Sequence, residues 1–252
     1  MRTIIALAFT LTALAAGPCG AAAPAIVIAP MHSEGEHARF PRLTSFPDAA
    51  VQARVNGLLA KAEAQDHASQ KDCLKQVLDE HQDKSFYDYS TSVAVTYVSR
   101  RYLSLSVDTS YDCAGAHPDA SSAPLTFDLA HGAAIDWNAA FKPGFLTTAD
   151  PKTGDVHKGK LAAIYFAHYA KLASRKGDAD CLDAVKTDDL LDPYLRLDAA
   201  QGGFLVTPQL AHVVAACGED IALSPDEIAP YLKDRALVDD LKAMPAPKKP
   251  GK

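Results

Sequence analysis

The spacing of apolar residues changes near residue 90, and this change constrains the fold more than any other feature of the sequence. Before it, apolar residues recur at every third or fourth position, which is the period of an amphipathic helix. After it, apolar and polar residues alternate over residues 93–97 and again over residues 103–107. Alternation predicts strands with one buried face, and the short join around Ser99-Arg100 makes the two runs an antiparallel hairpin.

Within this hairpin the inward and outward positions follow directly from the alternation. Tyr97 continues the inward series of Val93 and Val95, whereas Ser104 and Ser106 fall on the solvent side. We therefore expect one face of the hairpin to pack on a core and the other to contact water.

Helical spacing predicts two consecutive helices ahead of the hairpin. The first opens at Phe46-Pro47-Asp48, and its inward stripe consists of Val51, Val55, Leu58, Leu59 and Ala62. The second covers residues 69–80, with Ser69 as its N-cap and with Cys73, Val77 and Leu78 on its inward side. An apolar run at residues 25–30 predicts a strand before both helices.

The remaining elements are short, apart from one helix. A strand is predicted over residues 125–129, closed by a turn at His131-Gly132 and followed by a short helical or irregular segment over residues 135–141. Residues 145–159 read as a loop, because turn-forming residues are frequent there. A helix then runs from Lys160 to a glycine stop at Gly177. The residues that this helix should bury against the sheet are Leu161, Ile164, Tyr165 and Leu172.

Three short strands are predicted in the last third, at residues 195–197, 204–206 and 213–215, and Ser224-Pro225 begins a further helix. Helices and strands thus occur in separate runs rather than in strict alternation. The sequence predicts an α+β fold in which an antiparallel sheet carries helices packed on one face.

The first residues have the layout of a secretory signal peptide, in which Arg2 precedes an apolar run and small residues follow that run. We predict a signal peptide over residues 1–22, one domain over residues 23–243 and a disordered tail over residues 244–252. A lipoprotein anchor at Cys19 is disfavoured, because Pro18 stands where a small residue is expected. The predicted location is the periplasm, with no transmembrane segment in the mature chain.

Charge narrows the class of partner. The whole chain has 25 Lys and Arg against 31 Asp and Glu, and loss of Arg2 with the signal peptide leaves 24 − 31 = −7. A general nucleic-acid binder would carry a basic face, so nucleic acid is not an expected partner. Mild acidity favours a cationic partner instead.

Four cysteines remain after the signal peptide, which in an exported chain indicates two disulfides with three possible connectivities. None of their spacings is that of a zinc knuckle or a redox dithiol. Compact domains favour contacts between neighbours in chain order. We therefore predict the pairs Cys73–Cys113 and Cys181–Cys217.

The sharpest local signal is the run Cys-Ala-Gly-Ala-His-Pro at residues 113–118, between two predicted strands. Gly115 permits a positive φ or a close approach of another chain, and Pro118 forces His117 into an extended conformation. One interpretation is a binding or catalytic loop in which Asp112 or Asp119 orients the ring. The other is structural, with His117 tucked under the sheet and bonded to backbone. The candidate ligand-binding residues are Asp112, Gly115, His117 and Asp119.

Motifs for the common catalytic classes are missing from the sequence. It contains neither a G-x-S-x-G elbow nor a Gly-rich phosphate loop. Asp108 and Asp112 are the carboxylates available for glycoside hydrolysis. The polar segment with His32, Glu34, Glu36 and His37 matches no metalloprotease pattern, so neither a metal nor a cofactor is expected. We expect a protein without catalytic activity.

The hairpin, the Gly115-Ala116-His117-Pro118 loop, the segment Phe127-Asp128-Leu129 and the block at residues 210–232 together resemble the RsiV-like domain. That domain, of unknown function, occurs in exported bacterial proteins, including the ectodomain of a lysozyme-sensing anti-sigma factor, and it accompanies a deacetylase domain in some wall enzymes. The resemblance covers residues 40–232. Ala114 replaces a glycine that is common in the family pattern.

The resemblance implies a non-catalytic periplasmic binding module whose ligand is a lysozyme-like cationic muramidase or a peptidoglycan fragment. The alternative is a cell-wall hydrolase that uses His117 with a nearby Asp as acid and base, which requires His117 to line an open cleft. A purely structural envelope protein is a third hypothesis.

Overall fold

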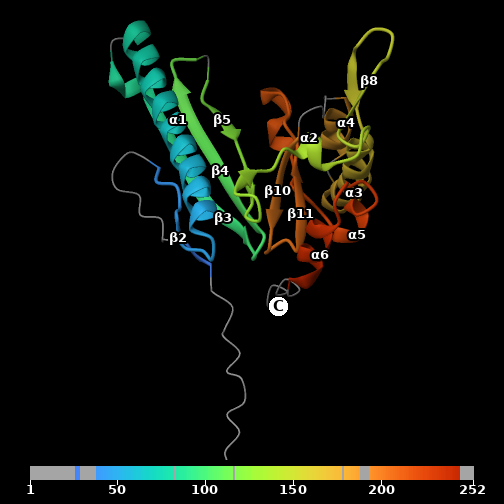
Figure 1. The fold of residues 1–252 in the computed structure, drawn as a ribbon. Helices are drawn as coiled ribbons and strands as arrows, with labels where there is room; N and C mark the ends of the chain where they lie inside the picture. The colour runs from blue at the N-terminus through green and yellow to red at the C-terminus, as the bar shows by residue number, and fades with distance from the viewer. Residues whose placement is uncertain are drawn as a thin grey trace, which may run out of the picture.

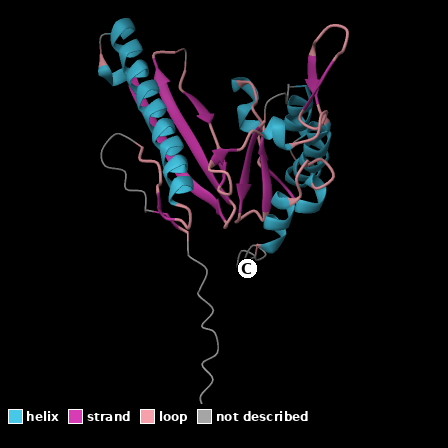
Figure 2. Cartoon of the chain, viewed as in Figure 1, coloured by secondary structure: helices cyan, strands magenta, loops and turns pink. Residues whose placement is uncertain are grey.

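The structure is a computed structural model that describes residues 26–28, 38–81, 83–115, 117–177, 179–187 and 193–244. The predicted α+β class is confirmed, since antiparallel sheets and helices make up the fold (Figures 1 and 2). The predicted signal peptide with Cys19, the segment with His32 to His37 and the tail beyond Met244 lie outside the described residues. Every helix within the described ranges is too short or too polar to cross a lipid bilayer.

The first sheet has the strand order β3-β4-β6-β7, and β5 pairs with β4 beside β6. Its strands are β3 (Tyr87–Val98), β4 (Tyr102–Cys113), β5 (Asp119–Ser122), β6 (Leu125–Asp128) and β7 (Ala133–Ala134). The predicted hairpin and the third strand are therefore confirmed. Gly132 takes a φ of 64° in the turn after β6, as a glycine there permits.

Helix α1 (Ala49–His81) is one continuous helix, so the prediction of two helices is wrong. Residues 63–70 contain neither Gly nor Pro. Within this stretch, Asp66 accepts hydrogen bonds from Tyr89 Oη at 3.1 Å and from Thr91 Oγ1 at 2.7 Å, which hold the middle of the helix on the sheet. Ser69 is thus interior rather than an N-cap. Leu58 and Leu78, predicted inward, are 36% and 37% exposed.

One face of the first sheet and α1 enclose the first hydrophobic core. This core consists of Phe40, Leu43, Val51, Val55, Leu59, Leu103, Leu105, Val107, Phe127 and Leu129. A two-stranded ribbon of β1 (Val27–Ile28) and β2 (Leu43–Ser45) lies at its margin. The strand predicted at residues 25–30 is present in its described part.

The second half contains a three-stranded antiparallel sheet in the order β10-β11-β12, covered by helices. Its strands are β10 (Tyr194–Asp198), β11 (Gly203–Thr207) and β12 (Ile221–Leu223), and the helices of this half are α2 (Trp137–Ala140), α3 (Lys160–Lys176), α4 (Ala179–Thr187), α5 (Pro225–Ile228) and α6 (Ala236–Ala243). The sequence pattern predicted a single sheet, and the described residues contain this second one as well. Figure 1 shows the layers in the order α1, first sheet, second sheet and helices.

Two predictions in this half are wrong. Residues 145–159 are not only loop, because β8 (Thr147–Ala149) and β9 (Val156–Lys158) form a hairpin there. Residues 213–215 lie in the 3-10 helix η2 (His212–Cys217), and the strand follows it as β12. Another short 3-10 helix, η1 (Lys84–Phe86), links α1 to β3. Helix α6 was not predicted.

Helix α3 has the predicted bounds, with Gly177 in the left-handed conformation at its end. Leu161 and Tyr165 are buried as predicted, whereas Ile164 and Leu172 are half-buried. Tyr165 and Tyr169 are buried further along, and their hydroxyls donate to the carbonyl oxygens of Glu219 and Cys217, both at 2.8 Å. The helix thus packs over the loop between β11 and β12 as well as on the second core.

A β-bulge in β3 joins the two halves. Val95 pairs with Leu105 but Tyr97 pairs with Ser104, so Thr96 is an extra residue. The extra residue turns Tyr97 away from α1 and into the second core, contrary to the prediction. Thr96 itself bonds to β10: Oγ1 donates to the Leu197 carbonyl at 2.7 Å, and its own carbonyl accepts from Ala199 N at 2.9 Å.

The face of β4 predicted to contact water is buried next to the bulge. Ser104 is 0% exposed. Its hydroxyl accepts a hydrogen bond from Leu197 N at 3.1 Å and lies 2.9 Å from Thr126 Oγ1. The prediction for Ser104 is therefore wrong, because β10 covers this end of the sheet. Each hydroxyl has a partner, as buried polar groups require.

The structure contains both predicted disulfides. Cys73–Cys113 ties α1 to the end of β4, with the Cα atoms 4.8 Å apart. Cys181–Cys217 ties α4 to η2, with the Cα atoms 5.2 Å apart. Each bond fastens a helix to an element that precedes a loop.

Candidate functional site

The first sheet carries a polar surface where the second half does not cover it. Residues at even positions of β4, and at even positions of β3 before the bulge, share the face opposite α1. Near the bulge this face is covered by β10, and beyond it the face carries Ser90, Ser92, Asp108 and Ser110. The alternation that predicted a solvent-facing side is thus correct for the distal part of the hairpin.

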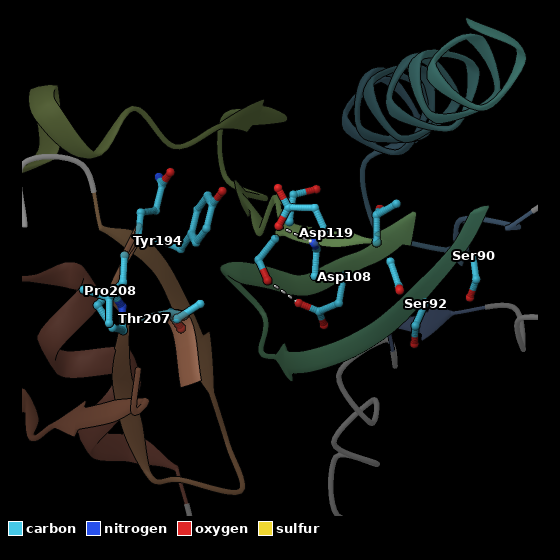
Figure 3. A pocket seen from close by; sticks show the side chains of 15 residues that line it. Ser90, Ser92, Asp108, Asp119, Tyr194, Thr207 and Pro208 are labelled. Carbon is cyan, nitrogen blue, oxygen red and sulfur yellow. Dashed lines mark hydrogen bonds between the residues drawn. The ribbon is translucent and has the colours of Figure 1, made fainter. Parts of the chain in front are cut away.

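This polar surface is one wall of a groove with a volume of about 520 Å³ between the two halves (Figure 3). From the first sheet, the groove is lined by Ser90, Ser92, Asp108, Thr109, Ser110 and all four residues of β5. From the second half, it is lined by Tyr194, Thr207, Pro208, Gln209, Leu210 and Ala215. Seven of the fifteen lining residues are Ser or Thr. Thr109 and Ser121 pair with each other on the face toward α1, so five hydroxyl residues remain for the groove side, namely Ser90, Ser92, Ser110, Ser122 and Thr207.

The charges in the groove are all negative. Asp108 and Asp119 are its two carboxylates, and neither Lys nor Arg is among the residues that line it in the described part of the chain. Ser122 Oγ donates to Asp108 Oδ1 at 2.5 Å, which orients this carboxylate across the β4–β5 pair. Both aspartates are exposed, so their carboxyl groups are accessible to a cationic partner.

A polar network fixes the opposite wall. The Arg196 guanidinium donates to Thr207 Oγ1 at 3.0 Å and to Asp220 Oδ2 at 2.7 Å, and the Thr207 hydroxyl donates to the other Asp220 oxygen. Thr207 also pairs with Tyr194 at the end of the β10–β11 ladder. This wall is thus positioned by residues behind it.

Only one of the four candidate binding residues lines this groove. Asp119 does, while Asp112, Gly115 and His117 are not among the lining residues. His117 is exposed, with Nδ1 3.2 Å from the Pro118 carbonyl oxygen. The structural interpretation is therefore wrong in placing His117 under the sheet, whereas its contact between the ring and a backbone carbonyl is present. The hydrolase alternative required His117 to line a cleft, and its position outside this groove gives that alternative no support.

The two carboxylates considered for glycoside hydrolysis are not brought together by β4. Asp108 and Asp112 lie on the same strand four residues apart, so their Cα atoms are separated by about 13 Å along an extended chain. Paired carboxyl groups in glycosidases are about 5 to 9.5 Å apart. Of these two residues, only Asp108 lines the groove.

The 113–118 loop has a positive φ at Ala114 and not at Gly115, where the sequence suggested it. Ala114 has a φ of 65°, whereas Gly115 is not among the residues with positive φ. An L-residue in the left-handed region costs about 1 to 2 kcal/mol. Part of this strain should be relieved by a glycine at position 114.

We therefore expect Ala114→Gly to raise the free energy of unfolding by up to about 1 kcal/mol, because glycine adopts positive φ without a steric penalty. Chemical denaturation compares the variant with the parent. Ala120→Gly is the matched control, since Ala120 lies in an extended strand and should lose stability on the same change. A less stable Ala114→Gly variant would contradict the expectation.

The sequence analysis missed most of the groove because its walls come from segments about 100 residues apart in the chain. Tyr194 and Thr207 belong to short strands whose alternation was seen, but no local pattern shows that they face β5. The groups of hydroxyl residues in β3, β4 and β5 were the available signal. Serine on a strand face ordinarily indicates contact with water alone.

Comparison with known proteins shows the fold. No protein-family profile and no curated protein matches the sequence. A DUF3298 family protein from Bacteroides fragilis has a similar structure, with a TM-score of 0.54, 13% identity and coverage of 87% of this chain and 98% of that one. A DUF3298 family protein from Pseudomonas aeruginosa PAO1 has a TM-score of 0.48 at 14% identity, covering 84% and 94%. The chain thus shares its α+β fold with the Bacteroides protein.

Proposed function

We propose that this protein is a non-catalytic binding module of the bacterial cell envelope, and that its ligand is a cationic wall-directed protein of the lysozyme-like muramidase class. The observation that carries the proposal is the groove with Asp108 and Asp119 and without a lining cation among the described residues. A cationic segment placed there meets two carboxylates. The net negative charge of the chain and the resemblance to the RsiV-like domain support the same class of partner.

The location in the envelope is supported by two observations. The sequence begins with the layout of a signal peptide. The two disulfides join all four cysteines outside it, and such bonds persist in oxidising compartments. A periplasmic location is therefore part of the proposal.

A peptidoglycan fragment is the second candidate ligand, and the hydroxyl residues on the groove side favour it. Such side chains can donate to and accept from sugar hydroxyls. Tyr194 adds an aromatic ring at the opposite wall. The volume of about 520 Å³ lies in the range of small-ligand sites.

The test is a titration of the mature protein with a cationic lysozyme and, separately, with a disaccharide-tetrapeptide from peptidoglycan. We expect the lysozyme to bind, and Asp108→Asn to weaken it by about five- to tenfold, because it removes one groove charge while keeping an acceptor for Ser122. Calorimetry at 50 and 300 mM salt should show weaker binding at the higher salt.

Asp239→Asn is the matched control, because it makes the same charge change on the exposed side of α6, away from the groove. It should leave the affinity within twofold of the parent. Equal effects of the two variants would place the contact elsewhere. Binding of the disaccharide-tetrapeptide alone would replace the first ligand with the second, and binding of neither would remove the proposal.

A further inference from the structure

Strand β5 has a free edge, and that edge forms part of the groove. Among the described strands β5 pairs with β4 alone. All four of its residues line the groove, and Asp119, Ala120 and Ser121 are exposed. A free sheet edge offers donors and acceptors to an added strand.

The register shows which main-chain groups point into the groove. Ala123 N donates to the Val107 carbonyl at 2.8 Å, which fixes the alternation of bonded and non-bonded pairs along β4 and β5. Ser122 and Ala120 then form the non-bonded pairs, so their N–H and C=O groups point away from β4. The Ala120 N–H is already engaged by the Asp119 carboxylate at 2.8 Å. No acceptor for the Ser122 N–H occurs in the described part of the chain.

We propose that the groove binds an extended basic segment of a partner protein, which adds to β5 as an antiparallel strand. This inference rests on the proposed function, since it gives the mode by which the groove binds a cationic protein. The basic character follows from Asp108, which shares the face of Ser122, and from Asp119 at the start of β5. The extended conformation follows from the free edge.

The pairing also sets where the basic residues stand. A partner residue that exchanges hydrogen bonds with Ser122 has its side chain on the same face as Ser122. That face is the one that carries Asp108 and Ser110. Lysine or arginine is therefore expected at alternate positions, at the residues whose own N–H groups bond to β5.

Two substitutions at one position separate the main-chain contact from the side-chain contact. Ser122→Ala removes the hydroxyl that bonds Asp108, and Ser122→Pro removes the same hydroxyl together with the N–H. Proline is tolerated on an edge strand where the N–H points outward. Thermal melting of both variants checks that each one folds.

The probe is a labelled ten-residue peptide, acetyl-(Lys-Thr)5-amide, measured by fluorescence anisotropy with the whole mature protein. We expect Ser122→Ala to bind within threefold of the parent and Ser122→Pro to bind at least tenfold more weakly. The peptide with N-methyl groups on its lysines should lose at least tenfold in affinity, and the one with N-methyl groups on its threonines should bind like the parent peptide.

Equal binding of the Ala and Pro variants, or equal effects of the two methylation patterns, would overturn strand addition. Failure of the peptide to bind at 1 mM would overturn it as well, even when lysozyme binds, and would leave the proposed function standing. Peptide binding with the expected pattern but without lysozyme binding would support the groove inference and remove the proposed partner.

Discussion

Replacing Leu161 with Asp is expected to lower the free energy of unfolding by at least about 4 kcal/mol, since it places an unpaired charge in an apolar core. Leu161 is 1% exposed and belongs to the second core. It lies in the first turn of α3, where its N–H donates to the Phe145 carbonyl at 2.8 Å. This hydrogen bond anchors the N-terminal end of α3, so the side chain at position 161 cannot turn outward without disrupting the segment around Phe145.

Thermal melting followed by circular dichroism measures this effect. For a domain of this size, 1 kcal/mol corresponds to about 2 to 4 °C, so the melting temperature should fall by roughly 10 °C or more. Ala167→Asp is the control, because it introduces the same residue on the exposed side of the same helix. A Leu161→Asp variant that melts with the control would show that α3 does not pack as described.

Removal of the Cys73–Cys113 bond has the second largest expected effect. The bond closes a loop with a sequence separation of 40, and a cross-link of that span stabilises by about 4 kcal/mol in the chain-entropy model, with smaller measured gains. We expect the double variant Cys73→Ala/Cys113→Ala to lose about 2 to 4 kcal/mol. Denaturant unfolding under non-reducing conditions measures the loss.

The Cys181–Cys217 bond supplies the comparison, because its separation of 36 makes the entropic effect nearly the same. Replacing both cysteines of that pair with Ala should therefore lower the free energy of unfolding by a similar amount. A reduced parent protein should be less stable than either double variant, since it lacks both bonds. Unchanged denaturation midpoints in both variants would contradict the expectation that the disulfides stabilise the fold.

The sequence predicted those elements whose ends and faces are set by neighbouring residues in the chain. Helix α3 ends at Gly177 as the sequence predicts, because a glycine can take the left-handed conformation there. The hairpin was predicted because its alternation matches the pleat of a strand. Helix α1 was divided wrongly because the polar residues around Asp66 resemble a break, whereas Tyr89 and Thr91 bond to Asp66 from the sheet. The residues next to Asp66 in the chain do not indicate that Tyr89 and Thr91 will bond to it.

The candidate site was predicted less well, because it depends on contacts between distant segments. The loop with Gly115 and His117 has a recognisable sequence, yet only Asp119 beside it lines the groove. Ser104 and Ser92 look alike in the sequence, although β10 buries the first and leaves the second on the groove wall. Their difference depends on where the second sheet docks, and that position is set by the extra residue Thr96.

The extra residue in β3 also determines how far the two halves depend on each other. Tyr97 lies in the second core, and its hydroxyl donates to Asp240 of α6 at 2.7 Å; burial, together with this carboxylate, raises the pKa of Tyr97, so the phenol keeps its proton. Two residues earlier, Val95 packs on the first core. A fragment cut between the halves would leave an aromatic face of the hairpin without cover. The hairpin thus contributes side chains to both cores, and neither core is complete without it.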